Sequence, residues 1–120
     1  NETDANNFAE MTKKETKKAV SHSLLGLQNR NEPLPKIGDF IVLTNWAGEA
    51  QCIVRTKSVS LKPYFSIDST YVQKEGYGDK SLEQWKNYYW NLFTNELQKF
   101  EREPRESMIV VCQEFEKVYE

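Results

Sequence analysis

Apolar and polar positions alternate along the chain in two ways, one typical of helices and one typical of strands. Residues 8–17 repeat apolar positions at helical spacing and carry lysines on the other side, which predicts a helix. Residues 19–27 mix small, hydroxyl-bearing and apolar side chains, which predicts a short strand or a loop. The first seven residues are polar, so we expect a frayed tail ahead of a single domain that spans residues 8–120.

Three further runs of β-branched and apolar residues predict strands. Residues 40–44 are mostly apolar and predict a buried strand. Residues 50–61 alternate, but their apolar face changes near Lys57, which predicts a β-bulge of the kind that bends strands in a barrel. Residues 108–119 return to a strand pattern. A last strand so distant in sequence from the first ones is suited to closing a small barrel, because closure removes exposed strand edges.

The region between these strands predicts two helices. Residues 66–75 place apolar side chains four positions apart and precede Gly76, so a short helix should end there. Ser81 and Gln84 form a capping box at the start of a longer helix that reaches residue 100. Its apolar stripe is predicted to comprise Leu82, Trp85, Tyr89, Leu92, Phe93, Leu97 and Phe100.

The charge balance changes what this domain is expected to bind. The chain has 120 residues, with 16 basic and 18 acidic side chains and a net charge of −2, so it is not a strongly basic nucleic-acid binder. The charges are uneven, since lysines gather at residues 13–18 and glutamates in the last twenty residues. A local basic patch of this kind favours a small anionic ligand or a single strand over a long duplex.

Cysteine usage and apolar run length exclude several classes of protein. Cys52 and Cys112 lie in separate strand-like runs without metal-ligand spacing, so we expect buried free thiols, no metal site and no cofactor. Two such cysteines without a signal peptide are typical of a cytoplasmic protein. The longest apolar runs are far too short to cross a bilayer, so no membrane partner is expected.

Several segments, in order along the chain, resemble one family. Residues 16–21 resemble a Gly-x-Lys-x-x-Thr motif, although threonine stands here for the glycine and serine for the last threonine. Residues 75–85 are similar to a Glu-Gly-x-Gly-Asp-x-Ser-Leu-x-x-Trp segment, and residues 32–39 and 110–116 also match. The chain thus resembles the ASCH (activating signal cointegrator homology) domains of the PUA-like superfamily over residues 8–119. This resemblance implies an α+β fold, a small mixed β-barrel of about five or six strands with flanking helices, and a cleft that faces RNA.

The resemblance also implies candidate catalytic residues. Small relatives hydrolyse N4-acetylcytidine with the lysine and threonine of the motif and a later glutamate, which fall here on Lys18, Ser21 and Glu75. A serine hydroxyl needs a nearby base, and a lysine can serve only if burial or a neighbouring cation lowers its pKa. If the segment is extended, however, Lys18 and Ser21 face opposite sides, so their contact requires a turn or a bulge. The structural alternative is a phosphate-binding surface lysine, a strand hydroxyl and a glutamate at a helix end.

Other residues are expected to contact a ligand. They are Lys17, His22, Trp46, Tyr77 and Asp79. Trp46 follows a strand in a turn and Tyr77 lies between two glycines, so both rings are placed to stack on a base. For Trp46 the sequence leaves a second position open, as a plug at one end of the barrel. Tyr88 and Trp90 lie off the apolar stripe and either pack elsewhere or line the cleft. Three functions stay open: binding of RNA or a modified nucleoside, hydrolysis of N4-acetylcytidine or a similar amide, and RNA cleavage.

Overall fold

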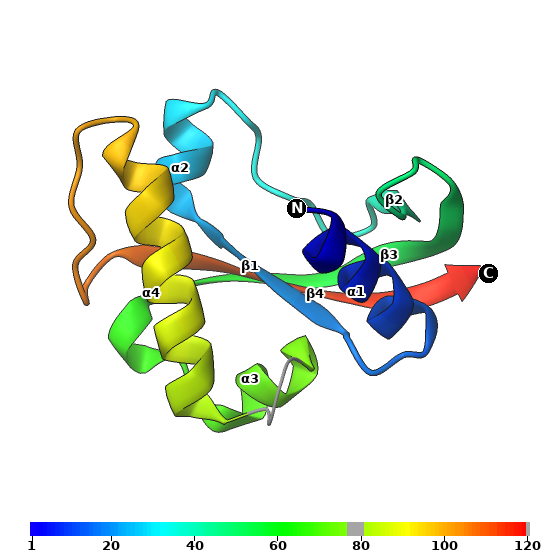
Figure 1. Cartoon of the computed structure of the whole chain (residues 1–120). Helices are drawn as coiled ribbons and strands as arrows, with labels where there is room; N and C mark the ends of the chain where they lie inside the picture. The colour runs from blue at the N-terminus through cyan, green and yellow to red at the C-terminus, as the bar shows by residue number, and fades with distance from the viewer. Residues whose placement is uncertain (77–80, 120) are drawn as a thin grey trace.

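The computed structural model describes residues 1–76 and 81–119 and consists of a sheet with helices around it (Figure 1). In chain order its elements are α1 (Glu2–Lys13), β1 (Ala19–Ser23), α2 (Leu24–Asn29), β2 (Phe40–Thr44), β3 (Ala50–Pro63), the 3-10 turn η1 (Tyr64–Ser66), α3 (Ser69–Glu75), α4 (Leu82–Gln98) and β4 (Ile109–Tyr119). Figure 1 shows α3 and α4 toward one end of the long strands β3 and β4, and α1 toward the other end.

The strands form one curled antiparallel sheet in the order β1-β4-β3-β2. The last strand of the chain, β4, therefore lies in the middle, and Val110 and Val111 in it are fully buried. The register of β3 against β4 shifts between Thr56 and Ser58, which confirms the bulge predicted near Lys57. The α+β fold with flanking helices is confirmed, with four strands in the described part of the chain where five or six were expected.

Strand β2 forms where residues 40–44 predicted a strand, but the expectation that it is buried was wrong. Its side chains alternate between exposed and half-buried, and Phe40 and Val42 are 67% and 55% exposed. The reason is its position, because β2 is the edge of the sheet and pairs only with β3. An apolar run alone does not distinguish an edge strand from a central one.

The N-terminal half of the chain also differs from expectation in its boundaries. Helix α1 begins at Glu2, within the segment expected to be a frayed tail, because the Asn1 side chain accepts a hydrogen bond from the backbone of Asp4. It ends at Lys13 rather than near residue 17. The segment that was ambiguous between strand and loop is strand β1 followed at once by α2, which Ser23 caps.

Helix α4 begins as predicted, since the Ser81 hydroxyl accepts a hydrogen bond from the backbone of Gln84. Its buried residues recur every four positions: Trp85, Tyr89, Phe93 and Leu97. Leu92 was predicted to belong to this stripe but is 42% exposed. The buried side chains repeat every four residues, and Leu92 lies outside that series. The stripe packs with Tyr64, Tyr71 and Val110 in the main core, and Phe8 of α1 covers a smaller cluster around Phe115.

Candidate functional site

The end of α3 is pressed against the segment that leads into β1. Gly76 ends the helix in the left-handed conformation with φ 78°, and a Cβ atom there would lie 2.4 Å from the carbonyl oxygen of Thr16. Only glycine combines that φ with so close an approach. The Lys18 amide also donates to the Lys74 carbonyl at 2.6 Å. These contacts place the carboxylate of Glu75 over the buried side of β1.

The Glu75 carboxylate receives a hydrogen bond from each of four buried side chains. Lys17 Nζ and the Tyr89 hydroxyl donate to Oε1, each at 2.9 Å, whereas the Ser21 hydroxyl and Trp85 Nε1 donate to Oε2 at 2.7 and 2.8 Å. Two carboxylate oxygens offer about four positions for accepting hydrogen bonds, so these four donors fill the hydrogen-bonding capacity of the carboxylate. The donors come from β1, from α4 and from the segment before β1, so one carboxylate connects three parts of the fold.

Lys17, rather than Lys18, is the lysine at this carboxylate. Lys17 is 1% exposed and its ammonium lies 4.8 Å from the centre of the Phe8 ring, whereas Lys18 is exposed. Burial lowers the pKa of Lys17, and the Glu75 charge and hydrogen bond oppose that shift. The expectation that Lys18 contacts Ser21 and Glu75 was therefore wrong. The chain is extended here, so alternate residues point the same way, and Lys17 and Ser21 share a side while Lys18 does not.

The hydroxyl protons around Ser21 can be assigned from the acceptors. A carboxylate only accepts, so Ser21 donates its proton to Glu75. The Tyr71 hydroxyl, 2.9 Å from Ser21 Oγ and 3.0 Å from the Val20 carbonyl oxygen, must then donate to one of these two atoms. Burial and the Glu75 charge raise the pKa of Tyr71 and keep this phenol protonated. The network thus extends from Lys17 through Glu75 and Ser21 to Tyr71.

One side of this network opens into a cavity of about 140 Å³. The cavity is lined by Asp4, Asn7, Val72, Glu75, Ser81, Gln84, Trp85, Tyr88 and Tyr89. Asp4 and Tyr88 also border a wider groove of about 460 Å³, which contains Phe8, Val42 and Trp46. The lining of the cavity includes Glu75 but neither Lys17 nor Ser21 among the described residues. A ligand in the cavity would therefore meet the carboxylate and the aromatic rings first.

Comparison with known proteins identifies the family. A model of the ASCH domain matches residues 1–119. The chain belongs to the ASCH domain family. Domains of this family are generally RNA-binding.

Solved structures agree with this assignment. An ASCH domain from Lactobacillus crispatus JV V101 is 32% identical, with a TM-score of 0.95 over 100% of this chain and 76% of that one. A protein from Enterococcus faecalis V583 is 26% identical, with a TM-score of 0.86 over 95% of this chain and 68% of that one. A third, hypothetical protein is 23% identical with a TM-score of 0.56, covers 93% of this chain and 92% of that one, and shows the fold alone. No curated protein matches the chain.

Within this ASCH domain, the residues expected to contact a ligand are spread over different surfaces. Trp46 is 60% exposed and lines the groove next to the cavity. His22 does not lie at Glu75. Its Nε2 forms a hydrogen bond with Gln113 Oε1 at 2.9 Å, and the residue borders a separate cavity. Tyr77 and Asp79 lie outside the described residues.

Sequence reasoning missed the roles of two aromatic residues at the carboxylate and of a third in the cavity. Trp85 and Tyr89 were expected to be core residues, and they are buried, but their polar ends also donate to Glu75. A signal was present, because a buried indole N–H or phenol needs an acceptor and these two stand one helical turn apart. The sequence left open whether Tyr88 and Trp90 pack on another element or line the cleft. Tyr88 lines both the cavity and the groove, whereas Trp90 packs on Tyr64 with ring centres 5.3 Å apart.

The described residues also bear on metal binding, on the two cysteines and on membrane-spanning helices. Across residues 1–76 and 81–119, no three His, Cys, Asp or Glu side chains gather in a way that could hold a metal ion. Cys52 and Cys112 are buried and form no disulfide, and burial raises the pKa of Cys112 to about 11. In the same residues no helix is both long and apolar enough to span a bilayer.

Proposed function

We propose that this ASCH domain binds single-stranded RNA by taking one unpaired base into the cavity beside Glu75. The observation that carries the proposal is that a small cavity and an aromatic groove adjoin and share Asp4 and Tyr88 as lining residues. Single-stranded RNA is recognised by splayed bases that stack on aromatic rings and expose their edges to hydrogen-bonding groups. A base in the cavity would meet three aromatic rings and the polar side chains of Asn7 and Gln84.

The groove outside the cavity suits the neighbouring nucleotides. The exposed rings of Trp46 and Tyr88 both border it, so flanking bases have surfaces on which to stack. Lys18 is exposed, and with Lys57 and Lys117 it borders a further hollow of about 200 Å³. Lys117 is paired with Glu15, and Glu116 also lines this hollow, so Lys18 and Lys57 are the lysines that offer positive charge to the phosphate backbone. We therefore assign Lys18 a phosphate-binding role.

Fluorescence anisotropy with labelled oligonucleotides tests this proposal. Single-stranded RNA of mixed sequence should bind more tightly than the same RNA in a duplex. Trp46→Ala and Tyr88→Ala should each weaken binding about fivefold to a hundredfold, since stacking on one ring contributes roughly 1–3 kcal/mol per base. Phe65→Ala is the matched control, because Phe65 is a similarly exposed ring, 58% exposed, outside the groove. Equal binding of the duplex, or no loss in either variant, would contradict the proposal.

One observation favours a second function, hydrolysis of N4-acetylcytidine or a similar amide. Glu75 is the member of the network that reaches the cavity, and it is held there beside Lys17, whose pKa is lowered. In this hypothesis substrate binding displaces one of the four donors from the Glu75 carboxylate. Glu75 then takes a proton from a water that attacks the acetyl carbonyl and delivers it to the departing amine. The products are acetate and cytidine, so atoms and protons balance.

Product analysis by chromatography separates the two functions. If the hypothesis holds, Glu75→Gln abolishes release of cytidine from N4-acetylcytidine, while Lys18→Ala leaves it nearly unchanged because Lys18 lies outside the network. Absence of turnover by a folded wild-type protein that binds RNA would leave the binding function alone. The same RNA analysed on a gel after incubation shows whether the strand is cleaved.

A further inference from the structure

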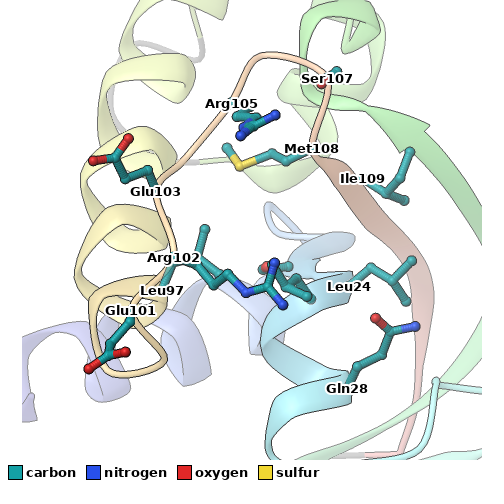
Figure 2. A pocket seen from close by; sticks show the side chains of 12 residues that line it. Leu24, Gln28, Leu97, Glu101, Arg102, Glu103, Arg105, Ser107, Met108 and Ile109 are labelled. Atoms are coloured by element: carbon teal, nitrogen blue, oxygen red, sulfur yellow. The ribbon is translucent and has the colours of Figure 1, made fainter.

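A hollow larger than both the cavity and the groove lies away from Glu75. It has a volume of about 660 Å³ and is formed by α2, the end of α4, the loop after α4 and the start of β4 (Figure 2). Glu75, Trp85 and Tyr88 are not among its lining residues. Its size falls in the range of pockets that hold small organic molecules and far exceeds what an inorganic ion needs.

Two arginines without partners line this hollow. Arg102 and Arg105 both line it, and within residues 1–76 and 81–119 neither guanidinium has an ion pair or hydrogen bond. Figure 2 shows Arg102 extending toward α2 and Arg105 near Met108. Glu101 and Glu103, from the same loop, also line the hollow, but Figure 2 shows their carboxylates pointing away from the two guanidiniums. The two arginines are therefore not paired with the acidic side chains of their own loop, and an anionic ligand can bind them.

The backbone of the loop holds both arginines in place. The amide of Arg102 donates to the Leu97 carbonyl at 3.1 Å, and the amide of Met108 donates to the Arg105 carbonyl at 3.0 Å. On the other side, an ion pair between Arg30 and Glu96 joins α2 to α4. Since both walls are tied together, the backbone that carries the two arginines needs little further ordering when a ligand binds.

The rest of the lining is amphipathic. Apolar side chains of α2, α4 and β4 form one part of it: Leu24, Leu97, Met108 and Ile109. Gln28 and Ser107 also line it, and they supply an amide and a hydroxyl. A ligand that matches this lining has an anionic end, a flat or apolar body, and edges that form hydrogen bonds.

We propose that this hollow binds a nucleoside that carries a terminal phosphate monoester. A monoester has a charge of about −1.5 to −2 at pH 7, which balances two guanidiniums, whereas a diester or a carboxylate balances only one. Arginine also pairs with phosphate through two parallel hydrogen bonds. The base and sugar then lie on the apolar part, with Gln28 and Ser107 at their edges. Free mononucleotides and the phosphorylated end of an RNA strand share this chemistry.

Calorimetric titration with the four nucleoside 5′-monophosphates tests the site. We expect at least one to bind, and Arg102→Gln/Arg105→Gln to weaken that binding by about a hundredfold, because each charge-assisted contact contributes roughly a factor of ten or more. Lys14→Gln/Lys36→Gln is the charge-matched control, since both lysines are exposed and outside the hollow. Binding should also weaken between pH 7 and pH 5, as the monoester with its second pKa of about 6 loses one charge.

Competition distinguishes the two sources of the ligand. If a 5′-phosphorylated tetranucleotide displaces the monophosphate and the unphosphorylated one does not, the strand end is a ligand; if neither does, the ligand is the free nucleotide. The proposal is overturned if no monophosphate binds, if the methyl ester of the phosphate binds equally well, or if the double arginine variant binds like wild type. Trp46→Ala should leave binding of the monophosphate unchanged, because this binding does not depend on the RNA groove.

Discussion

Lys17 Nζ lies 2.9 Å from Glu75 Oε1 although the residues are 58 positions apart, and the two side chains are only 0% and 1% exposed. Burying a charge without an opposite charge beside it costs free energy, so each residue offsets the cost of burying the other. The pair also joins the end of α3 to the segment before β1, which positions the carboxylate beside the cavity. Stability and site geometry therefore depend on the same contact.

Removing one member of this pair should destabilise the protein more than removing both. Glu75→Gln leaves the Lys17 ammonium buried without a counter-charge, and we expect the free energy of unfolding to fall by about 3–5 kcal/mol. Lys17→Met/Glu75→Gln removes both charges and should recover a large part of that loss. Urea unfolding of the wild type, both single variants and the double variant measures the coupling. Additive losses in this cycle would show that the pair is not coupled.

The two neighbouring lysines should differ sharply in their effect on stability. Lys17→Ala removes a buried cation from Glu75, whereas Lys18→Ala removes an exposed side chain. We expect a large drop in unfolding midpoint for Lys17→Ala and a midpoint close to wild type for Lys18→Ala. Both variants lose the same charge, so a difference reports burial alone. Similar midpoints would place the two lysines in equivalent surroundings.

Stability should rise with pH because of Lys17. Its folded-state pKa lies below the ordinary 10.5, so between these two values the unfolded chain binds more protons at this position than the native state. The penalty for burying the ammonium is complete below the folded pKa and is relieved as pH rises toward 10.5. The unfolding free energy of wild type minus that of Lys17→Met/Glu75→Gln should therefore increase between pH 8 and pH 10.

Taking that difference removes the contribution of other groups. Burial raises the pKa of Cys112 and of Tyr71, so both favour the native state less as pH rises through the same range. They are present in both proteins and largely cancel. A difference that stays flat across the series would mean that Lys17 does not titrate there.

Local sequence signals predicted most elements because their chemistry is local. The Ser81 cap, the left-handed Gly76 and the bulge in β3 each depend on neighbouring residues and were confirmed. The buried state expected for β2 was wrong, since sheet order is set by contacts distant in sequence. The choice between Lys17 and Lys18 failed for a related reason. The motif placed the role on Lys18, whereas the side of the chain that faces Glu75 is set by how α3 packs.

Trp85 has two roles that substitutions can separate. It is 5% exposed in the core, and its Nε1 donates to Glu75. Trp85→Ala should cost about 3–5 kcal/mol of unfolding free energy through the cavity that it leaves. Trp85→Phe keeps a ring but leaves Glu75 one donor short, so a smaller loss of about 1–3 kcal/mol is expected from thermal or urea unfolding. Equal losses in the two variants would assign the effect to the hydrogen bond and show that packing of the ring contributes little.

Gly76 should be less tolerant of alanine than any glycine in an open turn. An added methyl group faces two penalties there, a left-handed backbone at φ 78° and the Thr16 carbonyl oxygen at 2.4 Å. Gly48 is the matched control, because its φ is 84° but a Cβ atom there meets nothing within 4 Å. Gly48→Ala should then cost only the backbone term, about 1–2 kcal/mol, and Gly76→Ala clearly more.

The clash of an added methyl group with the Thr16 carbonyl oxygen also has a structural consequence. Relief of the clash at Gly76 requires the end of α3 to move away from Thr16, and Glu75 would move with it. Gly76→Ala should therefore weaken binding of single-stranded RNA in the anisotropy assay. Gly38→Ala, at a left-handed glycine that lines neither the cavity nor the groove, should not. If Gly76→Ala loses no more stability than Gly48→Ala and binds RNA like Gly38→Ala, the close approach of Gly76 to Thr16 does not position the carboxylate.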